Sequence, residues 1–272
     1  KKNGLDWWAA RRDWAQIDEV TPFPVRTALA KKWGSAVWYN MFYSGKLADY
    51  EQSIWTHALG GGRINFHPVY PSPKHMATGT MGPLLQGPLM RGQARIRLLN
   101  FITQSPLDCP VAVIFGHACA MNWAGPAYND VGLRLTDALW QQGYPADLIP
   151  ADEIQSGALR LTPEGWVQYG AQRYAAAVLF HPEFEPEEIA AFFRQAAGGK
   201  TALWRVGDWT RGPDDKPLEP RLPERVIASP EPAVCARQVV EKLRASAIAP
   251  QTPATEFTGW DQRAASPPTR GL

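Results

Sequence analysis

Two almost uninterrupted apolar runs place the tightest limits on the fold of this chain. They read VAVIF at 111–115 and YAAAVLFH at 174–181. A strand that is apolar on both faces must be covered on both faces, which is typical of parallel strands flanked by helices. A helical pattern follows each run, over 128–143 and over 186–199, and the second has proline at its start and glycine at its end. These residues predict an α/β sheet.

Further predicted elements complete this half of the chain. They are two strands, a small hairpin and a helix, at 145–150, 200–206, 158–170 and 232–246. Together they favour an open, doubly wound sheet of flavodoxin-like type over residues 107–249. From about Pro213 the chain becomes a proline-rich connection, and residues 250–272 are predicted to be a linker or the start of a further domain.

The first half repeats a pattern of strand, polar loop and helix. The predicted strands cover 15–22, 36–44 and 63–71, and the helices that follow them cover 25–33, 49–59 and 89–102. Such repeats predict parallel strands, but a closed eight-stranded barrel needs about 250 residues. We therefore expect residues 1–106 to be the C-terminal portion of a (β/α)8 barrel. A chain that opens on Lys1 rather than on methionine is expected to be an internal piece of a longer one, so its compartment is unknown.

Composition excludes several classes of function. The 28 basic and 26 acidic residues are scattered, so we predict neither a nucleic-acid partner nor a membrane surface, and no apolar run approaches the roughly 20 residues of a membrane span. The three cysteines are too few and too irregular for a disulfide framework or a metal site. Gly116 and Gly125 are too far apart for a dinucleotide-binding loop. We predict no metal and no cofactor.

Cys119, His181 and Glu183 raise the question of a cysteine-dependent amidotransferase or hydrolase, because each follows an apolar strand. A nucleophile on a strained turn needs small residues two places before and after it, where this chain has His117 and Met121. At the place where such a turn is expected, after 200–206, there is no cysteine. This reading is therefore a second alternative, and the His-Pro-Glu triplet is read as a strand-end loop.

Residues 36–45, 54–71 and 109–125 resemble the seventh barrel strand, the eighth barrel strand and the start of the next domain in glycoside hydrolases of the beta-galactosidase type. The resemblance covers roughly residues 14–210 and includes no catalytic signature. It implies a TIM barrel followed by a trimerisation domain that is similar to a class I glutamine amidotransferase. That domain is expected to be non-catalytic, to pack between subunits of a homo-oligomer and to help wall a neighbouring sugar site.

The resemblance also implies a pair of catalytic carboxylates and a carbohydrate substrate. The family nucleophile ends the seventh strand, where this chain has Asn40, which cannot act in this way. Successive strand residues face opposite sides, so one carboxylate at the end of the preceding strand is the candidate: Glu19, with Asp18 as the alternative. Candidate sugar-binding residues are Trp38, Asn40, His67 and Tyr70.

The loop 116–130 allows two uses. It follows a strand at the edge where open sheets bind ligands, and it also carries Trp123 and Tyr128, which could anchor a subunit contact. We favour the contact. The function predicted from the sequence is hydrolysis of glycosidic bonds, and the first alternative is a non-catalytic carbohydrate-binding or assembly module whose barrel has lost its carboxylates.

Overall fold

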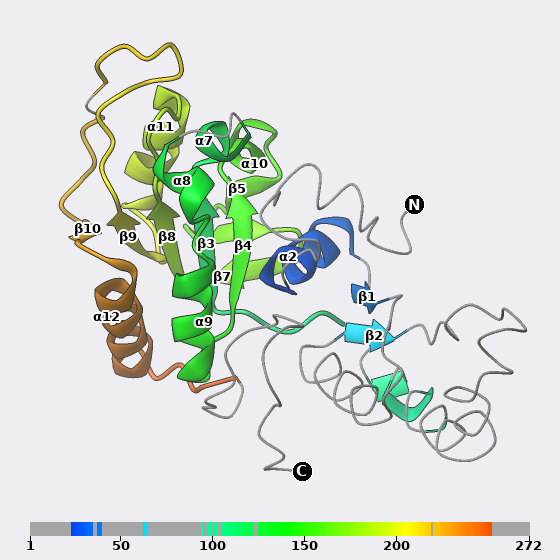
Figure 1. The fold of residues 1–272 in the computed structure, drawn as a ribbon. Coiled ribbons are helices and arrows are strands. Elements are labelled where there is room, and N and C mark those ends of the chain that lie inside the picture. Colours follow the sequence, from blue (N-terminus) through cyan, green and yellow to red (C-terminus); the bar gives the residue numbers. More distant parts are fainter. Residues whose placement is uncertain are drawn as a thin grey trace, which may run out of the picture. The chain divides into compact units, whose positions relative to one another are not determined.

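The computed structural model describes residues 23–34, 37–39, 62–64, 94, 97–99, 101–102, 105–121, 125–218 and 220–251. The chain divides into two compact units. Of the described residues, those between 37 and 107 belong to the first unit, and 23–34 with those from 108 onward belong to the second. The chain can be followed from blue to red in Figure 1.

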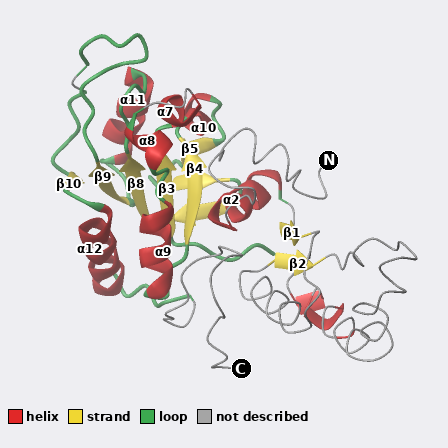
Figure 2. Ribbon diagram, in the orientation of Figure 1, coloured by secondary structure: helices red, strands yellow, loops and turns green. Residues whose placement is uncertain are grey.

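The strands of the described part are β1 (Val37–Tyr39), β2 (Gly62–Ile64), β3 (Val111–Phe115), β4 (Ala146–Pro150), β5 (Leu159–Leu161), β6 (Val167–Tyr169), β7 (Gln172–Tyr174), β8 (Ala176–Phe180), β9 (Ala202–Val206) and β10 (Val226–Ser229). The helices are α2 (Phe23–Trp33), α7 (His117–Met121), α8 (Pro126–Asn129), α9 (Leu133–Gln141), α10 (Asp152–Gln155), α11 (Glu187–Ala196) and α12 (Pro232–Ala245). Figure 2 shows helices flanking the strands of the second unit.

The core of the second unit is a five-stranded parallel sheet with the order β10-β9-β8-β3-β4. In its centre, Val113 of β3 lies between Leu148 of β4 and Val178 of β8. Every residue of these three strands is buried, so both faces of the sheet are covered. This arrangement explains the uninterrupted apolar runs and confirms the predicted α/β class.

Each long helix buries one face because its apolar residues recur three or four positions apart. In α9 the buried positions include Leu135 and Leu139, and in α12 they include Val239 and Leu243. These two helices pack against each other along the sheet, α9 next to β4 and α12 next to β9 (Figure 1). In α11 the buried face is formed by five residues, Ile189, Ala190, Phe192, Phe193 and Ala196.

A three-stranded antiparallel sheet, β5-β6-β7, lies between β4 and β8 in the chain. Its first two strands are the predicted hairpin. Tyr174 ends β7, and β8 begins at Ala176, so the apolar run at 174–181 is divided between two strands.

In the first unit, β1 and β2 form a parallel pair in which Val37 lies opposite Gly62. Parallel neighbours need a long connection, which the residues between these strands supply. Their pairing agrees with the parallel strands predicted there. The strand predicted at 15–22 and the helix predicted at 49–59 lie outside the described residues.

Two predictions for the second unit were wrong. The helix expected over 128–143 is two helices, α8 and α9, because Gly132 has a φ of 103° and its N–H donates to Oδ1 of Asp130 at 2.8 Å. A Cβ on Gly132 would lie 2.8 Å from Val113, so there is no room for a side chain at this position. The proline-rich connection after Pro213 contains β10, an edge strand too short to stand out in the sequence.

Candidate functional site

The candidate site lies where β3 and β8 end. From β3 the chain leads to β4 on one side of β3, and it later returns to β8 on the other side. In open α/β sheets, ligands bind at the carboxyl ends of the strands where the order reverses in this way. The segment from Gly116 through α7 and the loop 181–185 both start at this edge of the sheet.

The loop 181–185 is held by hydrogen bonds along its whole length. The backbone N–H of His181 donates to Val206 O at 2.8 Å, and that of Phe184 donates to Arg211 O at 3.0 Å. The Trp209 indole donates to the carbonyl of Glu185 at 3.2 Å. The loop is therefore fixed by the neighbouring chain segment 206–211, which extends from the end of β9.

Two residues of this loop have left-handed backbone conformations that are uncommon outside glycine. The φ angle is 47° at His181 and 67° at Phe184. Neighbouring glycines make room for His181: a Cβ on Gly116 would lie 2.1 Å from its carbonyl oxygen, and a Cβ on Gly207 would lie 2.4 Å from its Nδ1. Such strain persists only where the surrounding structure enforces it, and it is concentrated at functional sites.

Cys119 lies in α7 with its thiol directed at this loop. Its Sγ donates to the carbonyl oxygen of Glu183 at 3.1 Å. Burial raises the pKa of the Cys119 thiol to about 11, with smaller contributions from Glu185 and Glu183 and against a backbone hydrogen bond that lowers it. A nucleophilic cysteine needs the opposite environment, one that stabilises the thiolate.

The Glu183 carboxylate does not bond the His181 ring, as the carboxylate of a catalytic triad would. It accepts the backbone N–H of Thr210 at 2.7 Å and the Thr210 hydroxyl at 2.8 Å. The buried Nδ1 of His181 has no hydrogen-bond partner among the residues that the structure describes. Cys119, His181 and Glu183 are thus near one another in the loop region without the thiol–imidazole–carboxylate bonding of a catalytic triad.

Glu185 is a buried carboxyl that the sequence analysis missed. It is 2% exposed and accepts the N–H of Ala118 at 2.7 Å. Burial raises the pKa of Glu185 to about 7, while the hydrogen bond from Ala118 lowers it and the charge of Asp152 raises it. This carboxyl therefore changes protonation near neutral pH. Only its position two residues after the His-Pro-Glu triplet could have indicated it.

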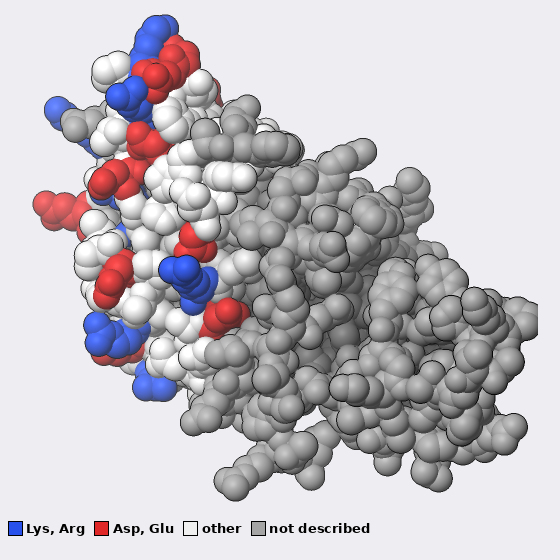
Figure 3. Space-filling model, in the orientation of Figure 1, with Lys and Arg blue, Asp and Glu red and all other residues white. Residues whose placement is uncertain are grey.

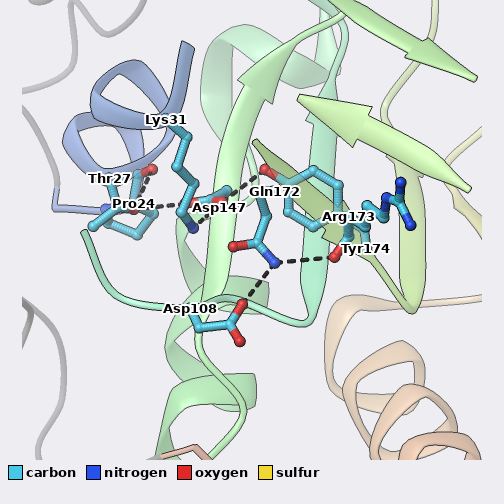
Figure 4. Close-up of polar contacts among 8 residues, drawn as sticks. All are labelled: Pro24, Thr27, Lys31, Asp108, Asp147, Gln172, Arg173 and Tyr174. Carbon is cyan, nitrogen blue, oxygen red and sulfur yellow. Dashed lines mark hydrogen bonds and ion pairs between the residues drawn. The ribbon is translucent and has the colours of Figure 1, made fainter. Parts of the chain in front are cut away.

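A second polar cluster lies around Asp147 of β4, where helix α2 packs (Figure 4). Asp147 is fully buried and accepts hydrogen bonds from the Thr27 hydroxyl at 2.7 Å and the Tyr174 hydroxyl at 2.7 Å, and it forms an ion pair with Lys31. Burial alone would lower the pKa of Lys31, but Asp147 raises it above its ordinary value. The cluster is closed to solvent, so it holds α2 rather than binding a ligand.

Two further contacts fix the C-terminal end of α2. Lys32 Nζ bonds both carboxylate oxygens of Glu153, at 2.6 and 2.8 Å. Gly170, in the turn between β6 and β7, lies so close that a Cβ there would be 1.9 Å from Lys31 O. A helix separated from β3 by more than seventy residues of sequence is thus part of the second unit.

The structure describes few of the sugar-site residues predicted from the sequence. Asp18, Glu19, Asn40, His67, Tyr70 and Trp123 lie outside the described residues. Trp38 is in β1, where the backbone alone is described, and Tyr128 is in α8, where it is 39% exposed. The predicted sugar site and subunit contact therefore stay predictions, as do the domain boundaries at 106 and 249.

The described residues show neither a large patch of one charge on the face drawn in Figure 3 nor a group of metal ligands. On the face drawn in Figure 3, Lys and Arg side chains of the described residues are mixed with Asp and Glu. In the same part of the chain, no group of three or more His, Cys, Asp and Glu side chains could hold a metal ion. None of the helices described there is long and apolar enough to cross a bilayer.

Comparisons of this chain with protein-family models, with curated proteins and with solved structures give no match.

Proposed function

We propose that this chain is part of a carbohydrate-active enzyme that hydrolyses glycosidic bonds. Residues 107–249 form a non-catalytic, amidotransferase-like domain that serves assembly and shapes the sugar site. Residues 1–106 are the C-terminal portion of the barrel, in which Glu19, with Asp18 as the alternative, supplies a catalytic carboxylate. The substrate is a carbohydrate, and the protein is a homo-oligomer.

The observation that carries the proposal is the combination of strand order and thiol environment in the second unit. Numbered along the chain, the parallel strands of its sheet have the order 2-1-3-4-5, which is typical of flavodoxin-like domains. The one cysteine near the switch point, Cys119, has a raised pKa, and its thiol donates a hydrogen bond to the carbonyl oxygen of Glu183. This supports a domain with an amidotransferase outline and no amidotransferase chemistry.

Two further observations agree with the barrel half of the proposal. The parallel pairing of β1 with β2 is what adjacent barrel strands require. Residues 36–45 and 54–71 contain these two strands, and they are the segments that resemble the last barrel strands of the beta-galactosidase type.

The test is hydrolysis of a panel of chromogenic aryl glycosides by the full-length protein. We expect turnover of at least one glycoside and a loss on the order of a thousandfold or more in Glu19→Gln, because removing an essential carboxylate removes transition-state stabilisation. Asp18→Asn tests the alternative carboxylate. Cys119→Ala is the matched control and is expected to retain activity within about twofold, since it removes no catalytic group.

Other outcomes separate the alternatives. Saccharide binding without turnover of any glycoside favours the non-catalytic binding or assembly module, which Asn40 at the family nucleophile position already suggests. Loss of a hydrolytic activity in Cys119→Ala, with Glu19→Gln unaffected, favours the cysteine-dependent enzyme and contradicts the proposal.

A further inference from the structure

A buried carboxyl joins helix α7 to the loop after β8. Glu185 is 2% exposed, and its carboxylate accepts the N–H of Ala118, the second residue of α7, at 2.7 Å. The main chain of Glu185 is fixed separately, because its carbonyl accepts the Trp209 indole at 3.2 Å and its N–H donates to Pro182 O at 3.0 Å. The loop side of this contact is therefore held in place, and α7 is the side that can move.

Helix α7 depends on few contacts. It has five residues, which is too short for a helix to be stable in water by itself. Cys119 and Ala120 are buried, whereas Met121 is 40% exposed. The Cys119 thiol donates to Glu183 O at 3.1 Å, and the bond from Ala118 to Glu185 is the second contact with the same loop. A segment of this kind opens at a lower free energy than the buried strands beside it.

The surroundings of Glu185 disfavour its charged form. Among the described residues, no Lys, Arg or His nitrogen lies within ion-pair distance of its carboxylate. A carboxylate buried without a counter-charge is costly. Burial accordingly raises the pKa of Glu185 to about 7, while the N–H of Ala118 lowers it, the charge of Asp152 raises it and the N–H of His117 lowers it. When α7 leaves the loop, the carboxyl is hydrated and its pKa returns toward the ordinary 4.5.

A second titratable contact of α7 acts in the same direction. His117 Nδ1 lies 3.6 Å from Asp152 Oδ2 in α10, and this contact is an ion pair only while the imidazole is protonated. It therefore holds α7 at acid pH and weakens as the pH rises. The other ionisable side chains of the surrounding segments are bonded to other groups or exposed to solvent: Cys119, Glu153, Glu183, Glu187, Glu188, Asp208 and Arg211.

We propose that α7 is a pH-controlled flap at the carboxyl edge of β3, docked on the loop 181–185 while Glu185 is protonated and His117 is charged, and released as the pH rises through neutrality. Release uncovers the loop and Cys119 at the edge where open sheets bind ligands, so access to this edge depends on pH. The flap is defined by the described residues alone and does not depend on the proposed function.

The test is hydrogen exchange of the full-length protein from pH 5 to pH 8, followed by mass spectrometry of a peptide containing residues 116–121 and corrected for the intrinsic pH dependence of exchange. A pKa of about 7 in the docked state and 4.5 in the released state makes the opening equilibrium rise by roughly 50-fold to 100-fold over this range. Glu185→Gln keeps an acceptor for Ala118 but cannot ionise, so its rise should be at most about fivefold. His117→Asn should reduce the rise by about twofold to fivefold, because a partly exposed ion pair contributes little.

Glu187→Gln is the matched control, since this carboxylate is two residues further on, exposed, and paired with Arg194 at 2.6 Å. It should keep the whole rise. At pH 8, low urea should leave exchange in α7 nearly unchanged and accelerate exchange in β3, because local opening exposes little surface. Exchange in α7 that matches β3 in both rate and urea dependence would show that the whole unit opens and would overturn the flap. A rise in Glu185→Gln as large as in the unaltered protein would overturn it as well.

Discussion

Replacing either Lys31 or Asp147 alone should destabilise the second unit far more than replacing both together. In Lys31→Met the Asp147 carboxylate stays fully buried with two hydroxyl donors but no counter-charge. In Asp147→Leu the Lys31 ammonium, on a residue that is 6% exposed, loses its counter-ion. Breaking a buried ion pair from one side costs about 3 to 5 kcal/mol.

The two single variants should differ in a way that follows from the hydrogen bonds. Asp147→Leu also leaves the Tyr174 hydroxyl without its acceptor, which adds about 1 to 3 kcal/mol. The Thr27 hydroxyl keeps a second acceptor in Pro24 O at 3.0 Å, so it adds less. We therefore expect a loss of about 3 kcal/mol in Lys31→Met and about 5 kcal/mol in Asp147→Leu, a large part of the 5 to 15 kcal/mol that is typical of a whole domain.

The double variant decides whether the ion pair is the cause. An apolar pair of similar volume is often as stable as a buried ion pair, so the double variant should lose only the about 1 to 3 kcal/mol that the unpaired Tyr174 hydroxyl costs, which is about 5 kcal/mol or more below the sum of the two single losses. The assay is urea unfolding of the full-length protein, followed by circular dichroism, with hydrogen exchange of residues 23–34 to locate the effect. Additive losses, or single losses below about 1 kcal/mol, would refute the reasoning.

Three further predictions follow from single residues. Gly170→Ala should destabilise the unit by several kcal/mol more than Gly157→Ala, measured by urea unfolding: both positions have positive φ, but a Cβ at Gly170 would lie 1.9 Å from Lys31 O, whereas one at Gly157 meets nothing within 4 Å. Equal losses would contradict the close approach of α2. Iodoacetamide should alkylate Cys119 slowly at pH 7.5, with a rate that rises toward its pKa of about 11, as mass spectrometry of the labelled peptide would record; rapid labelling below pH 8 would indicate a thiolate. Glu185 has a pKa raised to about 7 from 4.5, so between these pH values the folded chain binds a proton that the unfolded chain has lost. The free energy of unfolding should therefore fall by about 3 kcal/mol as the pH rises from 4.5 to 7. Glu185→Gln should remove that fall, and an unchanged pH profile in this variant would contradict the prediction.

The sequence was sufficient to predict the strands and helices that have strong local signals. The run at 111–115 is β3 residue for residue, and α11 and α12 lie within a few residues of their predicted bounds. Apolar spacing and an initial proline define both helices locally, and α11 also has glycine after its end. The break between α8 and α9 depends on Gly132 facing Val113, a contact with another strand. No local pattern shows such a contact.

The packing of α2 illustrates the same limit. Asp147 is a single acidic residue in a buried strand, so the sequence implies that some buried donor or cation must meet it. Which one it is depends on the path of the chain, since Lys31 is more than a hundred residues away. The helix at 25–33 was predicted correctly, and its contacts with the second unit could not be predicted.

The left-handed backbone of His181 is a further feature that the sequence did not predict. A left-handed backbone after β8 could be formed by glycine without strain, or by asparagine at small cost. The chain instead has histidine there, and with it an Nδ1 that is buried and unpartnered within the described residues. Neither cost stabilises the fold, and the surrounding glycines, Gly116 and Gly207, are needed to accommodate the residue. The left-handed backbone at this position therefore depends on Gly116 and Gly207, which are distant from His181 in the sequence, so no local pattern could have predicted it.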